Sequence, residues 1–169
     1  MAMNFKQLFG GVAAAVLLQA VASAEIPDQI ATAETPVATI HAEGAQVYEC
    51  KGDASGKLTW QFREPVATLL IDGEAVGSHY AGPNWELTDG SAVSAKVSGR
   101  APGASASDIP LLRLDVSAHR DVGQLASVST IQRLNTRGGV AEGGCASQGA
   151  FLSVPYTADY AFFGKNVSF

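Results

Sequence analysis

The sequence predicts an all-β fold: a single-domain antiparallel β-sandwich or partly closed β-barrel of about nine strands. Two observations lead to this prediction. Apolar and polar residues alternate with a period of two in clear runs at residues 57–64, 91–99 and 111–119. No window keeps an apolar period of 3.6 residues for more than two turns, and clusters of Gly, Pro, Asp and Ser separate the runs. Short strands joined by turns follow from this pattern.

The N-terminal residues 1–24 have the three parts of a secretory signal peptide: Lys6 near the start, an apolar run, and an Ala22-Ser23-Ala24 end. The apolar run is shorter than the ~20 residues that cross a bilayer, so we expect cleavage after Ala24 and no membrane span in the mature chain. Removing 24 residues from 169 leaves 145, a normal size for one domain. We expect a flexible lead-in over residues 25–36, one β domain over 37–169, and a periplasmic or extracellular location.

Charge and cysteine content narrow the possible partners. Without Lys6 the chain has ten basic and sixteen acidic residues, a net charge near −6 with neutral histidines. An acidic chain without a basic run is a poor nucleic-acid binder, because phosphate contacts need clustered Lys and Arg. Cys50 and Cys145 remain in the mature chain and meet an oxidising compartment, which favours a disulfide. A metal site is not expected, since neither cysteine has a second Cys or His at short spacing.

The first half of the domain is expected to form strands at residues 45–51, 57–64 and 66–71. Trp60 and Phe62 share the apolar face of the second strand and are expected in the core. Pro65 separates the second strand from the third, and an Asp72-Gly73 turn ends the third.

The second half is expected to form strands at residues 91–99, 111–119, 124–135 and 151–163. The alternation in 124–135 is irregular, because Gln132 shares a face with apolar residues while Ile131 shares one with Arg133. An irregular pattern of this kind indicates a polar group turned inward. Residues 136–148 form a Gly-rich loop that carries Cys145.

Residues 78–90 are the strongest candidate site, because they gather an imidazole, two aromatic rings and carboxylates around a Gly82-Pro83 break. His79 is the candidate acid or base, with Glu86 or Asp89 as its partner. The alternative, which we favour, is that His79 is hydrogen-bonded and simply holds the corner. His41, His79 and His119 lie on separate strands and do not suggest a metal site.

A ligand-binding surface is the second reading of the same region. Tyr80 and Trp85 flank the Gly-Pro break and are expected to be exposed beside Glu86. The strand end that carries Gln132, Arg133 and Asn135 would add hydrogen-bonding groups. Alternatively, Arg133 forms a buried pair with Asp159 that joins the last two strands.

Five stretches together resemble the DUF3455 family of secreted bacterial and fungal proteins of unknown function: GSHYAGPNWE at 77–86, DGS at 89–91, IQRLNTRGG at 131–139, GC at 144–145 and VPYTADY at 154–160. The resemblance covers nearly all of the mature chain and implies no mechanism. Some fungal relatives carry a malate dehydrogenase label. The glycines of residues 138–144 have neither the Gly-x-Gly-x-x-Gly spacing nor a following helix, so no nicotinamide or other cofactor is expected.

These observations leave three functions open. We expect a secreted binding module for an unknown small molecule or a glycan from the envelope or the environment. The first alternative is a cofactor-independent enzyme that uses His79, and the second is a structural protein of the envelope. A pocket that holds His79 beside a carboxylate would favour catalysis, whereas an exposed aromatic strip would favour binding.

Overall fold

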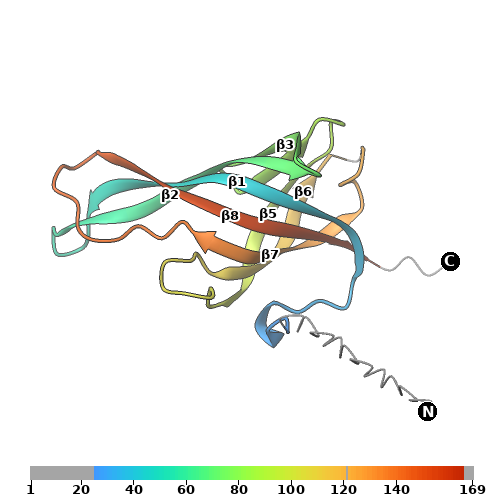
Figure 1. Ribbon diagram of the computed structural model, residues 1–169, viewed down its shortest axis with the longest axis horizontal. Coiled ribbons are helices and arrows are strands. Elements are labelled where there is room, and N and C mark those ends of the chain that lie inside the picture. The colour runs from blue at the N-terminus through green and yellow to red at the C-terminus, as the bar shows by residue number, and fades with distance from the viewer. Residues whose placement is uncertain (1–24, 121, 166–169) are drawn as a thin grey trace, which may run out of the picture.

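Eight antiparallel strands form one sheet that closes into a barrel (Figure 1). The computed structural model describes residues 25–120 and 122–165. The strands are β1 (Thr35–Gly52), β2 (Leu58–Ile71), β3 (Glu74–Tyr80), β4 (Asn84–Leu87), β5 (Ala92–Ala101), β6 (Leu111–His119), β7 (Val128–Gly138) and β8 (Phe151–Gly164). Each strand pairs with the next, and β8 also pairs with β1. The all-β prediction is confirmed, with a closed barrel as its architecture. The predicted signal peptide lies outside the described residues.

The strand count differs from the prediction at Pro65. Instead of separating two strands, Pro65 lies within β2, where it pairs with Gln46 of β1. Pairing of β2 with β3 begins only at Ala67. At Pro65 no β3 residue is in register, so the N–H that proline lacks is not needed for a hydrogen bond to β3. The Asp72-Gly73 turn then joins β2 to β3 with positive φ at both residues, the geometry that suits a right-handed twisted hairpin.

Three strands continue past the barrel as an extension that we call the arm, formed by residues 47–52 of β1, 58–65 of β2 and 151–155 of β8 (Figure 1, left). Here β2 and β8 each have only β1 as a partner strand. Trp60 is therefore half-buried and Phe62 is 55% exposed. The prediction that both lie in the core is wrong, because the arm has no opposite wall to cover its apolar face.

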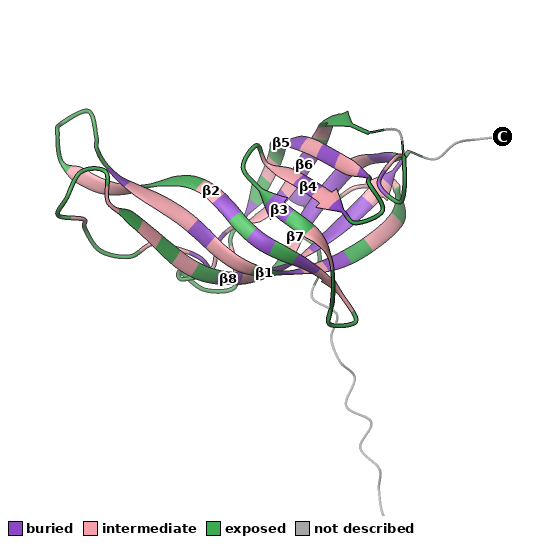
Figure 2. Cartoon of the chain, turned by 90° about the horizontal axis from the view of Figure 1, so that it is seen from above, coloured by how far each residue is buried: buried purple, intermediate pink, exposed green. Residues whose placement is uncertain are grey.

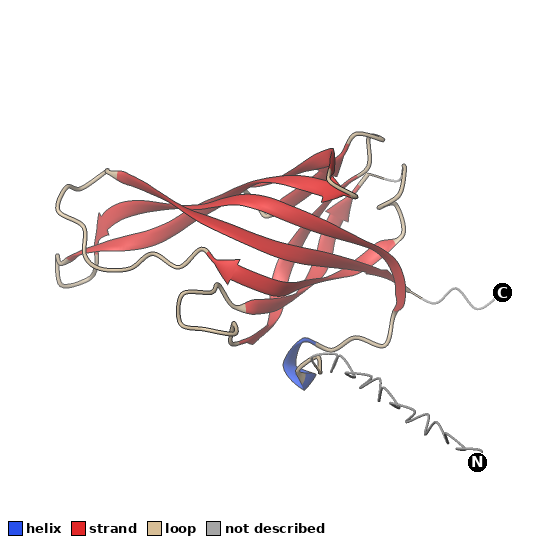
Figure 3. Cartoon of the chain, in the orientation of Figure 1, coloured by secondary structure: helices blue, strands red, loops and turns tan. Residues whose placement is uncertain are grey.

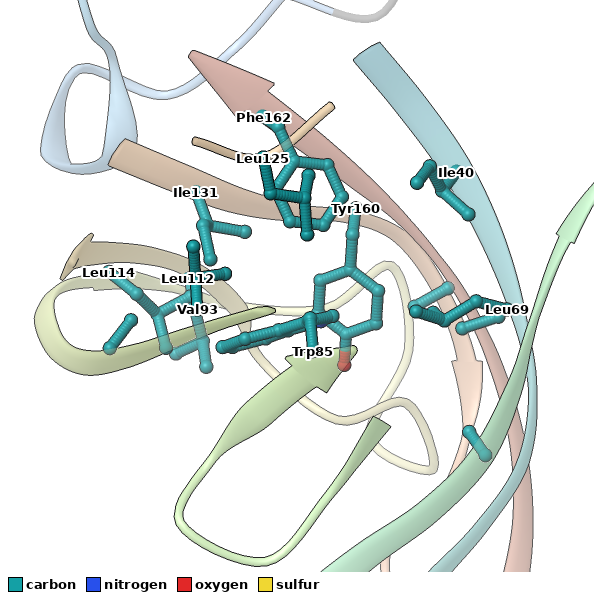
Figure 4. Close-up of a cluster of buried hydrophobic side chains, with 14 of the residues drawn as sticks. Ile40, Leu69, Trp85, Val93, Leu112, Leu114, Leu125, Ile131, Tyr160 and Phe162 are labelled. Carbon is teal, nitrogen blue, oxygen red and sulfur yellow. The ribbon is translucent and has the colours of Figure 1, made fainter. Parts of the chain in front are cut away.

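The hydrophobic core lies inside one end of the barrel, and Figure 2 marks the buried positions along the strands. Trp85 lies in it with 1% exposure and makes edge contacts with Tyr160 and Phe162 (Figure 4). The expectation that Trp85 is exposed is wrong. In the β3–β4 pair, Trp85 is directly opposite His79, and both face the interior, so Tyr80 and Glu86 on alternate positions face outward.

The lead-in is held against the outside of the barrel at its short 3₁₀ helix η1 (Asp28–Ile30), drawn in blue in Figure 3. Ile30 is fully buried, and its carbonyl accepts a hydrogen bond from Gln132 Nε2 at 2.6 Å. The backbone of Gln29 comes so close to Gly99 of β5 that a Cβ there would lie 2.1 Å from Gln29 O. The lead-in over residues 25–36, expected to be flexible, is therefore held against β5 and β7 at residues 28–30. None of the helical segments in residues 25–120 and 122–165 has the length and apolar character needed to cross a membrane.

A disulfide between Cys50 and Cys145 ties the Gly-rich loop to the end of the arm, as the sequence predicts. Backbone hydrogen bonds reinforce this attachment, since Cys50 donates to Ala150 O at 2.8 Å and Gly149 donates to Cys50 O at 2.9 Å. The bridge closes a loop across a sequence separation of 95 residues.

Removing this bridge should destabilise the fold. In the chain-entropy picture, a loop of this length contributes about 4–5 kcal/mol, so Cys50→Ser/Cys145→Ser should lower the free energy of unfolding by up to that amount. Urea unfolding with and without a reducing agent measures the effect. Reduction should destabilise the wild type and leave the double variant unchanged; an equal response of both proteins would contradict the structural role of the bridge.

The position of Trp85 gives a second test of the fold. Trp85→Ala removes a fully buried ring and should cost about 3–5 kcal/mol of stability, whereas Tyr80→Ala, on the outer face, should cost much less. Thermal unfolding followed by circular dichroism compares the two variants. Equal, small shifts in melting temperature would show that Trp85 is not part of the core.

Candidate functional site

A cavity of about 550 Å³ enters the barrel from the base of the arm. All eight strands contribute residues to its wall. At one end it is lined by Phe62 and Val97, which are 55% and 40% exposed, and at the other by Trp85 and Tyr160, which are 1% exposed. The cavity is therefore open to solvent at one end, which we call the mouth, and closed by the core at the other.

Most of the cavity wall is apolar. The aliphatic and proline side chains come from β2, the β3–β4 turn, β5, β6 and the segment before β6: Pro65, Pro83, Val97, Ile109, Pro110, Leu112 and Leu114. Gly82 and Pro83 lie in the wall, so the Gly-Pro break that stands out in the sequence forms part of this cavity. A mostly apolar wall with a few polar groups is typical of small-molecule sites.

Three rings in contact with one another close the inner end. His79 lies parallel to Trp85, with ring centroids 4.3 Å apart and an angle of 14°, and Tyr160 meets both rings edge-on. His79 Nδ1 lies 2.8 Å from the carbonyl of Asn84. A carbonyl can only accept, so Nδ1 carries the proton and Nε2 is the unprotonated nitrogen of a neutral ring.

Burial determines the protonation state of His79 and of the tyrosines around the inner end of the cavity. Desolvation lowers the pKa of His79 to about 4, a hydrogen bond from the ring to Asn84 opposes the shift, and the positive charge of Arg133 adds to it. Burial also raises the pKa of Tyr48, Tyr156 and Tyr160 above the usual range. The imidazole and the phenols are consequently neutral at neutral pH.

Arg133 projects into this neutral surrounding from β7, where it pairs with Leu112 of β6 and Tyr160 of β8. Its Nε and Nη2 donate to the carbonyl of Pro110 at 3.0 and 2.8 Å. Among the described residues no carboxylate forms a salt bridge with Arg133. The irregular alternation of residues 124–135 arises in part because this guanidinium is turned inward, as the pattern predicts.

Two further polar groups of the wall are buried without a hydrogen-bond partner of normal geometry: Trp85 Nε1 and Gln46 Nε2. Trp85 and Gln46 are 1% and 3% exposed. An unpaired buried donor carries a desolvation cost that a hydrogen-bond acceptor in the cavity would remove.

The carboxylates expected beside His79 lie elsewhere. Glu86 projects from the outer face, where it accepts from the hydroxyl of Tyr80 and from Arg120 Nη1, both at 2.8 Å. Asp89 holds the turn after β4 by accepting from Ser91 and from the backbone N–H of Gln124. Within the described residues, neither carboxylate reaches His79, so the acid–base pair considered from the sequence is not formed.

The remaining residues of the expected ligand-binding surface do not lie together in the structure. Gln132 lies on the outer side of β7 beneath η1, and Asn135 donates to Asp159 at 2.8 Å on the barrel exterior. Asp159 is bonded to His41 at 2.7 Å and not to Arg133, so the alternative Arg133–Asp159 pair is wrong. Of the six residues expected to contact a ligand, Trp85 and Arg133 line the cavity.

Sequence reasoning missed several wall residues, notably Gln46 and Tyr48. No local pattern marks them, because they meet only when distant strands close the ring. Across residues 25–120 and 122–165, no group of three or more His, Cys, Asp or Glu is placed to hold a metal ion.

Comparison with known proteins gives one match. A family model described as "Protein of unknown function (DUF3455)" matches residues 30–164, which include every strand of the barrel. Comparison with curated proteins and with solved structures gives no match.

The depressed pKa of His79 makes stability depend on pH. The folded state binds this proton with a pKa of about 4, whereas an unfolded chain binds it near 6.5, so the unfolded state holds more protons between these values. The stability contributed by neutral His79 is fully present above pH 6.5 and is lost as the pH falls toward 4, by about 3 kcal/mol in all.

His79→Gln removes this titration and should flatten the curve. Urea unfolding from pH 7 to 4.5 should show a smaller loss of stability in the variant than in the wild type, while carboxylates such as Asp89 contribute equally to both. Parallel curves for the two proteins would mean that His79 does not titrate below its ordinary range.

Proposed function

The chain belongs to the DUF3455 family, and we propose that it is a secreted binding protein that holds a small, largely apolar molecule inside its barrel. The cavity of about 550 Å³ carries this proposal. Its volume falls within the range of about 300–1,000 Å³ typical of small-molecule sites. The interior of a closed eight-stranded barrel is either filled by side chains or holds one small ligand, and here side chains leave a cavity.

The character of the wall supports an apolar ligand over a glycan. A sugar presents many hydroxyl groups, each of which needs a hydrogen-bond partner once it leaves water. Aliphatic side chains such as Leu112, Leu114 and Ile109 offer none. The exposed pair of aromatic rings from which a glycan was expected is absent, since Trp85 is in the core and Tyr80 bonds Glu86 outside.

The compartment is inferred from two features. The signal-peptide pattern of residues 1–24 directs export, and the Cys50–Cys145 disulfide is stable in an oxidising environment. An apolar molecule is poorly soluble in water. A secreted protein that encloses it in a cavity would keep it in solution outside the cytoplasm.

A neutral apolar dye tests the proposal. N-phenyl-1-naphthylamine becomes more fluorescent in apolar surroundings, and it should bind the wild-type protein saturably with one site per chain. Val97→Trp places a large ring at the mouth and should weaken binding by at least about tenfold.

Val66→Trp is the matched control. Val66 is also an exposed β-strand valine, but it lies outside the cavity wall, so this variant should bind the dye like the wild type. Absence of saturable binding to the folded wild type would overturn the proposal. Equal weakening by both tryptophans would place the dye outside the barrel.

A further inference from the structure

We propose that the ligand carries a negatively charged head group, which Arg133 binds inside the barrel, on an apolar body that occupies the rest of the cavity. This inference rests on the proposed interior site and adds the chemical class of its occupant. The shared chemistry is an anionic oxygen-rich group, a carboxylate or a phosphate, attached to a hydrocarbon part.

The charge balance of the wall is the first observation. The cavity is lined by three arginines, Arg63, Arg100 and Arg133, and by no Asp or Glu. The chain as a whole has more acidic than basic residues, 16 against 11, so the positive charge of the cavity wall and its mouth is opposite to the net charge of the protein. A low-dielectric opening lined by one sign of charge concentrates ions of the other sign.

The pairing of these arginines is the second observation. At the mouth, Arg63 is partly neutralised by Glu64 and Glu49, at 2.9 and 3.8 Å. Arg133, in contrast, has only neutral hydrogen-bond partners among the described residues: the carbonyl of Pro110 and the side chain of Tyr160. Arg133 is half-buried, and a cation that is drawn partly out of water is normally paired with an anion, because loss of hydration is costly for an unpaired charge.

The unpaired donors are the third observation. Trp85 Nε1 is almost completely buried and has no acceptor, and it shares the cavity wall with Arg133. Gln46, on β1, is also almost completely buried; its Nε2 makes no hydrogen bond of normal geometry, and its side chain interacts only with Tyr156 among the described residues. An anionic head group supplies several acceptor oxygens, so it can satisfy these donors and the remaining N–H groups of the guanidinium together. The apolar wall of Leu112, Leu114 and Ile109 then suits the hydrocarbon part.

Three ligands of equal chain length test the charge requirement: decanoate, decyl phosphate and 1-decanol. Each is titrated against wild-type protein that has N-phenyl-1-naphthylamine bound. At least one of the two anions should displace the dye at concentrations at least about tenfold below 1-decanol, because a charge-assisted hydrogen bond is stronger than a neutral one. A preference for decanoate over decyl phosphate, or the reverse, identifies the head group.

Variants then assign the effect to Arg133. Arg133→Gln should remove the advantage of the anion and leave displacement by 1-decanol within about twofold of wild type. Arg137→Gln changes an exposed arginine of the same strand that does not line the cavity, and it should keep the wild-type preference. Circular dichroism melting checks that each variant is folded. Arg100→Gln, at the mouth, is a second cavity variant and should weaken the anion less than Arg133→Gln.

Distinct outcomes separate this inference from the proposed function. If the dye binds and 1-decanol displaces it as well as both anions do, the anionic head group is overturned and the interior site stands. If the dye does not bind at all, the proposed function fails first. The comparison of the three ligands on the wild type is decisive even where Arg133→Gln does not fold.

Discussion

Pairing between β1 and β8 is the constraint on which the rest of the structure depends. These strands lie at opposite ends of the domain in sequence, and their hydrogen bonds turn an open sheet into a ring. Closure makes one face of every strand an interior, where Trp85, Tyr160 and Phe162 pack as one cluster (Figure 4). The same closure encloses Arg133, whose guanidinium would face solvent on an open sheet. Core and cavity are therefore products of a single long-range contact, which is costly in loop entropy to form.

Alternation of apolar residues was enough to predict the fold class, but not which apolar faces become enclosed. The pattern at Leu112 and Leu114 and that at Trp60 and Phe62 look alike in sequence. The first pair lies in the barrel and is buried, whereas the second lies in the arm and is not. A period of two separates the two faces of a strand, but the presence of an opposite wall depends on partners far along the chain.

Local sequence was also insufficient to predict which residues of the candidate site lie together. His79, Trp85 and Glu86 belong to one short motif, and sequence proximity suggested that they act together. Antiparallel pairing instead sets His79 opposite Trp85 on the inner face and Glu86 opposite Ser78 on the outer face. Arg133 was identifiable as unusual because it breaks the alternation of its strand. Its neighbours Pro110 and Tyr160 come from the segment before β6 and from β8, so its surroundings could not be read from local sequence.

The arm has unpaired strand borders, although the sheet as a whole is closed. Beyond the barrel, the outer sides of β2 and β8 have no neighbouring strand among the described residues, and each contains a proline, Pro65 or Pro155. Prolines and charged side chains on a strand border discourage the addition of further strands. At these borders the arm offers free backbone groups for assembly, by strand pairing, with a second copy or with an extended peptide. Because Phe62 and Arg63 belong both to the arm and to the mouth, such assembly would also control access to the barrel interior.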